Sequence, residues 1–288
     1  MYNNKLYTPL RYPGGKARFA PYIAKIMRAN GLDGGHYLEA YAGGAGAALE
    51  LLYDGTVTDI HINDADPAVR DFWLTATQHT DALIHMVETE PVTMDAWHHW
   101  RAVLIGQTEA ELVHRGFATL FLNRTNRSGI LKAGVIGGKA QAGEYKLDAR
   151  FMRNVLVSRL ERLGQQAKRI HVYGEDALTL LKRCKEFLPS RSLIYLDPPY
   201  YIKGQGLYRN YYEHKDHLAI AKLLQSSKFS RRWVVSYDDA PAIRAMYANV
   251  HCMGYGLHYT ARRQYMGAEV MFFGPTLHDI PDELPVAA

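Results

Sequence analysis

The chain has few cysteines and no long apolar run. Its 288 residues include only two cysteines, Cys184 and Cys252, too few for a disulfide framework, so we expect a reducing, cytoplasmic location. No segment reaches the roughly 18 consecutive apolar residues of a membrane span, and residues 1–11 contain no apolar signal-peptide core. Histidines, cysteines and carboxylates show no metal-ligand spacing. We therefore expect neither a membrane nor a metal as a partner.

Positive charge is in modest excess over negative charge. The formal net charge is +5, which permits a polyanionic partner without requiring one. Basic side chains gather in one middle segment of the chain: Arg124, Arg127, Lys132, Lys139, Lys146, Arg150, Arg153 and Arg159. Such a segment can be an ordinary solvated surface or a nucleic-acid-binding surface, and the charge alone does not distinguish the two.

The most informative stretch joins an apolar run to a Pro-Pro pair. Residues 193–196 predict a buried strand of a parallel sheet, and Pro198 and Pro199 stop it directly after Asp197. A carboxylate and the ring of Tyr200 would then lie at the carboxyl end of a central strand, where open α/β sheets bind ligands. Asp197 and the Pro198 carbonyl could each accept one hydrogen of a planar amine, with Tyr200 stacked on its ring. The alternative is a strand followed by an ordinary turn.

Further strand ends carry small or acidic residues. A strand at 37–40 runs into the loop Glu-Ala-Tyr-Ala-Gly-Gly-Ala-Gly and then a helix, as in nucleotide-binding α/β folds, although the loop is not GxGxxG. It can equally be a tight strand–helix connection. Asp64 and Asp66 follow a strand at 57–62, and Asp176 follows one at 170–173. Such acids can bind a ribose or an adenine amine, or can cap the next helix.

The α/β rhythm is interrupted in the middle of the chain. Apolar spacing predicts helices over these residues: 73–90, 95–104 and 111–122. A long polar, glycine-containing loop is then predicted from residue 123 to 145, and its Arg, Asn and Ser side chains suit contacts to phosphates and base edges. Later, residues 202–217 interleave glycines, aromatics and cations, which is typical of a lid over nucleic acid.

Together these pieces resemble the Dam-like (D12 class) adenine DNA methyltransferases. The motifs occur in the family's order: Arg-Tyr-Pro-Gly-Gly-Lys at 11–16, the small-residue loop, the basic insertion, and Asp-Pro-Pro-Tyr. The resemblance covers roughly residues 8–274. It implies an α/β, Rossmann-like fold that uses S-adenosylmethionine, with a mostly parallel sheet, an antiparallel C-terminal hairpin and an inserted, mainly helical target-recognition domain. The implied domains are a catalytic domain (1–67 and 155–275), the insertion (68–154) and a loose tail (276–288).

The resemblance also implies a set of site residues. The implied catalytic residues are Asp197, Pro198, Pro199 and Tyr200. The implied cofactor-binding residues are Tyr12, Lys16, Glu39, Tyr41, Gly43, Asp64, Asp176 and Asp197. The implied DNA-binding residues are Arg11, Arg124, Asn126, Arg127, Ser128, Lys132, Lys203 and Tyr208. Two positions depart from the family's pattern: Ala45 replaces a usual glycine, and Arg127 stands where an aromatic is frequent.

The activity that the resemblance implies is site-specific methylation of DNA. A monomer would transfer a methyl group from S-adenosylmethionine to the exocyclic amine of a flipped-out adenine in double-stranded DNA, with a cognate restriction enzyme as a potential partner. Two alternatives stay open: a methyltransferase acting on another amine (cytosine, an RNA adenine or a protein glutamine), and an inactive DNA-binding relative. The recognition sequence does not follow from these motifs.

Overall fold

The computed structural model describes residues 7–12, 16–202, 212–259 and 265–282, without the side chains of 257–268. The chain forms two compact units. The first contains residues 1–15 and 66–174, and the second contains residues 16–65 and 175–288. The compact units thus place residues 1–15 and 155–174 in the first unit, whereas the sequence-based boundaries place them in the catalytic domain. Which function each unit carries stays a prediction.

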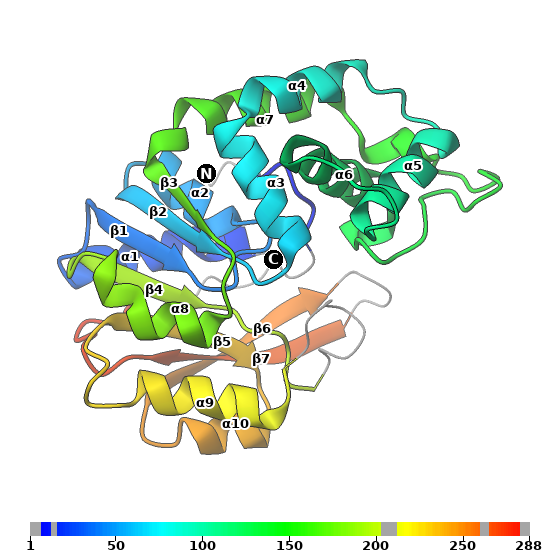
Figure 1. Cartoon of the computed structure of the whole chain (residues 1–288). Coiled ribbons are helices and arrows are strands. Elements are labelled where there is room, and N and C mark those ends of the chain that lie inside the picture. The colour runs from blue at the N-terminus through cyan, green and yellow to red at the C-terminus, as the bar shows by residue number, and fades with distance from the viewer. Residues whose placement is uncertain (1–6, 13–15, 203–211, 260–264, 283–288) are drawn as a thin grey trace. The chain divides into compact units, whose positions relative to one another are not determined.

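Six of the described strands lie in the second unit and follow one another in the sheet order β2-β1-β4-β5-β7-β6 (Figure 1). Their bounds are β1 (Gly35–Glu39), β2 (Val57–Asn63), β4 (Ser192–Leu196), β5 (Arg232–Asp238), β6 (His251–Tyr259) and β7 (Tyr265–Phe273). β2, β1, β4 and β5 are parallel, whereas β7 runs antiparallel to β5 and β6. The predicted mostly parallel sheet with an antiparallel C-terminal hairpin is confirmed.

The parallel pairing gathers chemistry at one edge of this sheet. The carboxyl ends of β1, β2, β4 and β5 all point the same way, so Glu39, Asn63, Asp197 and Asp238 lie at or just beyond the same edge. β4 is buried along its whole length, as a central parallel strand with covered faces should be. The predicted strand at 193–196 and its stop at Asp197 are therefore confirmed.

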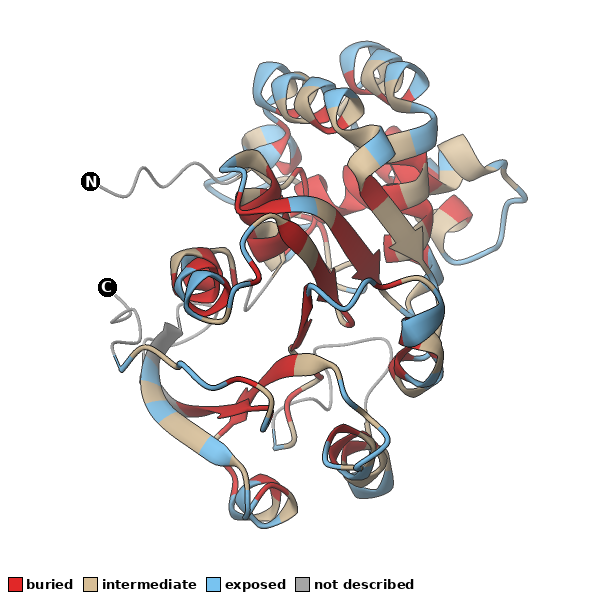
Figure 2. Cartoon of the chain, turned by 90° about the vertical axis from the view of Figure 1, so that its left-hand side faces the viewer, coloured by how far each residue is buried: buried red, intermediate tan, exposed pale blue. Residues whose placement is uncertain are grey.

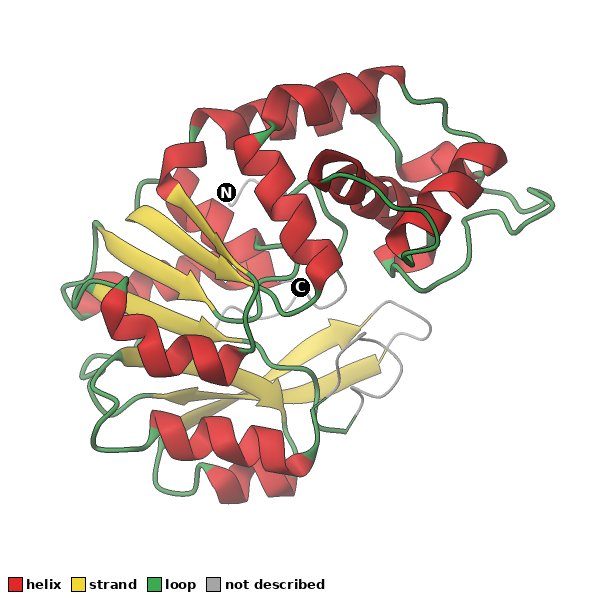
Figure 3. Cartoon of the chain, in the orientation of Figure 1, coloured by secondary structure: helices red, strands yellow, loops and turns green. Residues whose placement is uncertain are grey.

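Helices cover both faces of the sheet in the second unit (Figures 1 and 3). α1 (Ala20–Ala29) and α2 (Gly46–Tyr53) lie on one face, and α8 (Ala177–Arg183), α9 (His214–Leu224) and α10 (Pro241–Met246) lie on the other. The helices turn buried residues toward the strands. α1, α8, α9 and α10 also carry exposed positions, whereas every residue of α2 is buried or half-buried (Figure 2). Short 3-10 turns precede α1, as η1 (Lys16–Phe19), and follow α8, as η5 (Cys184–Glu186).

The first unit is mainly helical. Its helices are α3 (Pro67–Gln78), α4 (Thr80–Thr89), α5 (Met94–Leu104), α6 (Leu112–Thr125) and α7 (Arg153–Gln165); its shorter elements are η2 (Arg127–Gly129), η3 (Leu147–Arg150), η4 (Ala167–Arg169) and β3 (Ile170–Tyr173). α6 is buried continuously from Gly116 to Thr125. It packs closely on α3, because a Cβ at Gly116 would lie 2.2 Å from the Thr75 hydroxyl. α6 is thus the central helix of this unit.

Two predicted element boundaries in the first unit are wrong. The single helix expected at 73–90 is instead two helices, because the backbone leaves the helical region at His79 (φ −134°, ψ 40°). The polar run expected to be a loop from residue 123 begins inside α6, which continues to Thr125. Tertiary partners, described below, keep these polar residues helical.

The prediction of a loose tail from residue 276 is also wrong for residues 276–282, the part of the tail that the structure describes. Leu277 is buried. The Asn30 side chain accepts a hydrogen bond from the His278 N–H (2.8 Å) and donates one to the Asp279 carbonyl (2.7 Å). The Tyr22 hydroxyl donates to the Pro281 carbonyl (2.9 Å). These bonds fix the segment against α1.

Within the described ranges, no helix has both the length and the apolar character needed to cross a membrane.

Candidate active site

The corner after β4 holds a carboxylate with fixed orientation. The Asp197 side chain is about one-quarter exposed (26%), and Pro198 behind it is buried. The Ser236 hydroxyl of β5 donates a hydrogen bond to Asp197 Oδ1 (2.8 Å), and Lys16 Nζ lies 3.3 Å from the same oxygen. Asp197 therefore faces solvent with one oxygen held by two partners from other elements.

The backbone that follows the Asp-Pro-Pro-Tyr motif is fixed by a second acid, Asp238 of β5. Asp238 Oδ1 accepts a hydrogen bond from the Tyr201 N–H (2.8 Å), and Oδ2 accepts one from the Ile202 N–H (2.9 Å). The turn through Pro198, the half-buried Pro199 and the buried Tyr200 is thus held between β4 and β5. A turn fixed at both ends presents its carbonyls and ring in one arrangement.

A buried carboxylate on β7 ties Lys16 to Tyr200. Glu269 is 1% exposed and Lys16 is 6% exposed. Glu269 Oε2 lies 3.3 Å from Lys16 Nζ and accepts a hydrogen bond from the Tyr255 hydroxyl (2.8 Å). Its Oε1 accepts from the Tyr200 hydroxyl (3.2 Å). One ammonium therefore lies between two carboxylates, Asp197 and Glu269.

Burial and charge act in opposite directions on this cluster. Burial disfavours the charged form of Lys16, but Asp197, Tyr255 and Glu269 outweigh it and raise the pKa of Lys16 well above its usual value. Burial also raises the pKa of Asp197, and Lys16 opposes this rise. Lys16 thus remains an ammonium ion and offsets the charge of Asp197.

The small-residue loop after β1 is held by acids on both sides. Gly43 donates its N–H to Asp64 Oδ2 (2.9 Å). Ala45, where the resemblance expects glycine, has a left-handed backbone (φ +46°), a conformation that costs an L-residue roughly 1–2 kcal/mol. Buried Glu39 accepts hydrogen bonds from the Ala48 N–H (2.9 Å) and the Tyr37 hydroxyl (3.3 Å). Burial raises the pKa of Glu39 to about 8.

The acids after β2 and before α8 could either cap a helix or bind a ligand according to the sequence, and the structure shows which of them cap helices. Asp66 caps α3 by accepting from the Ala68 N–H (3.0 Å), whereas Asp64 holds the small-residue loop. Asp176 caps α8 through the Thr179 N–H (3.2 Å) and also accepts from the Tyr212 hydroxyl (3.4 Å). Tyr212 in turn accepts from the hydroxyl of half-buried Tyr41 (3.1 Å).

The second unit thus contains most of the predicted cofactor-binding residues: Lys16, Glu39, Tyr41, Gly43, Asp64, Asp176 and Asp197. Tyr12 belongs to the first unit, as does its neighbour Arg11.

In the first unit, one asparagine clamps the segment that carries Arg11. Asn123 Oδ1 accepts from the Arg11 N–H (2.7 Å), and Asn123 Nδ2 donates to the carbonyls of Arg11 (2.9 Å) and Gly129 (2.8 Å). Gly129 has φ +74°, and a Cβ there would lie 2.3 Å from the Arg11 carbonyl oxygen. Only glycine allows this close approach. The turn after α6 and the N-terminal segment are therefore packed as one.

Two residues predicted to contact DNA are instead buried in the first unit. The Arg124 guanidinium donates to the Pro9 carbonyl (2.7 Å from Nε), and burial lowers its pKa to about 9. The Asn126 side chain accepts from the Trp97 indole (2.8 Å) and donates to the carbonyls of Ile130 and Leu131. Both side chains already bind groups inside the unit, which favours internal support, and their contact with DNA stays a prediction.

The remaining predicted DNA-binding residues differ in their exposure. Arg127 and Lys132 are exposed, and Ser128 is half-buried with a left-handed backbone (φ +56°). The Arg127 guanidinium lies against Gly134, whose added Cβ would be 2.9 Å from its Nη2. Lys203 and Tyr208 lie outside the described residues.

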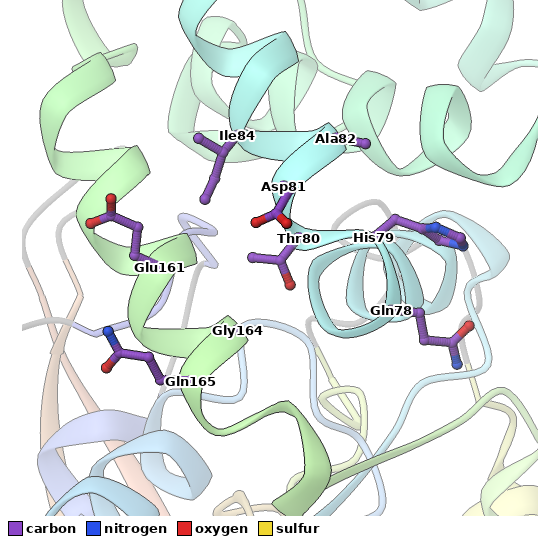
Figure 4. Close-up of a pocket in the computed structure, with 9 residues that line it drawn as sticks. All are labelled: Gln78, His79, Thr80, Asp81, Ala82, Ile84, Glu161, Gly164 and Gln165. Carbon is purple, nitrogen blue, oxygen red and sulfur yellow. The ribbon is translucent and has the colours of Figure 1, made fainter.

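A surface hollow in the first unit contains none of the predicted site residues. It lies between the start of α4 and the end of α7 (Figure 4) and is lined by Gln78, His79, Thr80, Asp81, Ala82, Ile84, Glu161, Gly164 and Gln165. Within the part of the chain that the structure describes, no group of three or more His, Cys, Asp or Glu residues is arranged to hold a metal ion.

The sequence did not single out the residues that orient the Asp-Pro-Pro-Tyr turn. Ser236 and Asp238 come from β5, and Glu269 comes from β7. A usable signal existed for Glu269: it is a charged residue directly before an apolar stretch, Val270 to Phe273, that is buried throughout. A buried charge in such a strand usually has a partner.

Comparison with known proteins identifies the family. The family model described as "D12 class N6 adenine-specific DNA methyltransferase" matches residues 12–264. A solved structure of a candidate class I S-adenosylmethionine-dependent methyltransferase from Listeria monocytogenes aligns over 100% of this chain and 67% of that chain, with 10% identity and a TM-score of 0.40. No curated protein matched in sequence. Because the family match spans most of the chain, this protein belongs to the D12 class N6 adenine-specific DNA methyltransferases, which use S-adenosylmethionine.

Proposed function

We propose that this chain methylates the exocyclic amine of an adenine that has been flipped out of duplex DNA. The observation that carries the proposal is the fixed corner after β4. Asp197 is oriented there by Ser236 and Lys16, and Asp238 holds the following backbone. An amine buried in the base stack cannot reach a donor in such a corner, so the base must leave the helix.

The chemistry at this corner follows from its acceptors. The Asp197 carboxylate and the Pro198 carbonyl each accept one N–H of the amine, which directs the nitrogen lone pair toward the methyl carbon. Bound S-adenosylmethionine would supply the methyl group: its C–S bond would break as the N–C bond forms, leaving a neutral thioether, and the extra proton of the nitrogen would pass to Asp197 or to water. The Tyr200 ring stacks on the base. Positioning and charge account for the rate in this scheme, since no covalent enzyme intermediate is needed.

The polar side chains of the second unit fit S-adenosylmethionine. That cofactor presents hydroxyls, amines and a positively charged sulfur, and it supplies the transferable methyl group. Three carboxyl groups near the sheet edge can accept hydrogen bonds from these hydroxyls and amines: Glu39 beside the small-residue loop, Asp64 after β2 and Asp176 before α8. We propose that Asp64 binds the ribose hydroxyls, Asp176 the adenine amine and Glu39 the methionine end.

Duplex DNA is the proposed macromolecular substrate, and the first unit the proposed reader of its sequence. Exposed Arg127 and Lys132, in and after the turn that Asn123 clamps, suit contacts to phosphates and base edges. We also propose that the enzyme is a monomer, that it is located in the cytoplasm, and that a cognate restriction enzyme is its partner.

The test is identification of the product. Purified protein is incubated with methyl-labelled S-adenosylmethionine and mixed-sequence duplex DNA, and the labelled nucleoside is identified after digestion. We expect N6-methyladenine from the wild type. Asp197→Ala should lose activity by about 10²-fold or more while binding S-adenosylmethionine in calorimetry.

A matched control removes another acid near the end of β5. Asp239→Ala deletes a carboxylate that pairs with Arg244 (2.6 Å) rather than with the corner, and it should keep full activity. Methylcytosine, labelled RNA or labelled protein as the product would contradict the proposed substrate. Full activity of Asp197→Ala would contradict the mechanism.

A further inference from the structure

Glu269 lies at the sheet edge where the parallel strands end, although its own strand runs the opposite way. In the register of β5 and β7 it is opposite Asp238, and in that of β6 and β7 it is opposite Tyr255. Its side chain is 1% exposed. A buried carboxylate is costly unless it is paired and hydrogen-bonded, so its partners indicate why it is tolerated there.

Two of those partners belong to the catalytic corner. Glu269 Oε1 accepts from the hydroxyl of Tyr200 (3.2 Å), which is the last residue of the Asp-Pro-Pro-Tyr motif. Glu269 Oε2 contacts Lys16 Nζ (3.3 Å), and the same Nζ contacts Asp197 Oδ1 (3.3 Å). Glu269 is therefore one bond from the proposed stacking ring and two contacts from the proposed amine acceptor.

We propose that Glu269 is a positioning residue for methyl transfer: it fixes the plane of the Tyr200 ring and, through Lys16, the carboxylate of Asp197. The inference rests on the proposed function of Asp197 and Tyr200.

Glu269 would act by restricting the motion of the Tyr200 and Lys16 side chains. A tyrosine ring can turn about its side-chain bonds, but a hydroxyl bonded to a buried carboxylate restricts that motion. An ammonium between two carboxylates stays midway, whereas one paired with Asp197 alone can be drawn toward it and compete with the substrate amine. Misplacement of about 1 Å in a reacting arrangement can cost roughly 10²-fold in rate.

The experiment compares four variants for kcat, KM for DNA, S-adenosylmethionine affinity and melting temperature. Glu269→Gln keeps the shape of the side chain but removes its charge, and we expect kcat to fall about 10- to 100-fold. S-adenosylmethionine affinity should stay within about twofold. Tyr200→Phe keeps the ring and deletes only its hydroxyl, so kcat should fall several-fold. The double variant should lose less than the product of the two single losses, because the neutral glutamine oxygen holds the Tyr200 hydroxyl more weakly than the carboxylate does.

Tyr255→Phe is the matched structural control. It deletes a hydroxyl that binds the same carboxylate (2.8 Å), but Tyr255 is outside the Asp-Pro-Pro-Tyr motif and should leave kcat within about threefold. A merely structural role for Glu269 would instead make Tyr255→Phe as slow as Tyr200→Phe, with kcat following the melting temperature.

The outcomes separate this inference from the proposed function. If wild-type protein makes no methyladenine, the proposed function fails. If the wild type makes methyladenine but Glu269→Gln keeps its kcat, or the two losses multiply in the double variant, the positioning role is refuted. Should Glu269→Gln not fold, unchanged kcat in Tyr200→Phe would still refute it.

Discussion

Replacing Glu39 by glutamine removes a carboxylate that the second unit buries at the end of β1. Burial raises the pKa of Glu39 to about 8, from an ordinary 4.5. The native state therefore keeps a proton on Glu39 that the unfolded chain loses above pH 4.5. Because the native state binds more protons in this window, wild-type stability falls as the pH rises from 4.5 to 8.

The size of this effect follows from the shift. It is about 1 kcal/mol at pH 5 and reaches roughly 5 kcal/mol above pH 8. Glutamine is neutral throughout and still offers an oxygen to the Ala48 N–H and the Tyr37 hydroxyl, which Glu39 binds. Glu39→Gln should therefore resemble the wild type at pH 5 and unfold at clearly higher urea concentration at pH 9.

Urea unfolding of both proteins at five pH values from 5 to 9 measures the difference directly. The gap in the free energy of unfolding should widen by about 4 kcal/mol across that range. Parallel pH dependences would refute the reasoning, because they would mean that Glu39 is ionised in the native state at neutral pH.

Further predictions concern the first unit. Gly129 and Gly138 both have left-handed backbones (φ +74° and +75°), but a Cβ would clash with the Arg11 carbonyl at Gly129 and meets nothing within 4 Å at Gly138. Gly138→Ala should cost roughly 1 kcal/mol of unfolding free energy and Gly129→Ala about 1–3 kcal/mol more; equal losses in urea unfolding would contradict the packing. Arg127→Ala and Lys132→Ala should each lower the salt dependence of duplex-DNA affinity by about 0.9 in log–log slope, with unchanged stability; an unchanged slope would argue against phosphate contact.

Local sequence was sufficient to predict the corner after β4. The apolar run at 193–196 and the two prolines after Asp197 fix a strand and its end within a few residues, and β4 ends at Leu196 as predicted. The small-residue loop after β1 was recognisable for the same reason. In both cases the chain's own backbone preferences and burial pattern are sufficient, without knowledge of distant partners.

Distant partners explain what the sequence did not yield. Asn123 and Arg124 are polar residues in a polar run, so composition predicts an exposed loop. The structure buries them because they bind backbone groups of Arg11 and Pro9, more than a hundred residues earlier. The role of Glu269 likewise depends on Lys16, 253 residues away. No window of neighbouring residues contains that information.

The clamp on the N-terminal segment has a consequence for the order in which the protein forms during translation. The segment at 8–11 is made early, but Asn123 and Arg159, which bind Arg11 and Thr8, lie 112 and 151 residues later. At a synthesis rate of about 5–20 residues per second, the segment waits roughly 6 to 30 seconds for its partners. The first unit can complete its contacts once residue 174 has emerged. The corner after β4 is completed late, because Glu269 lies near the end of the second unit, which extends to residue 288.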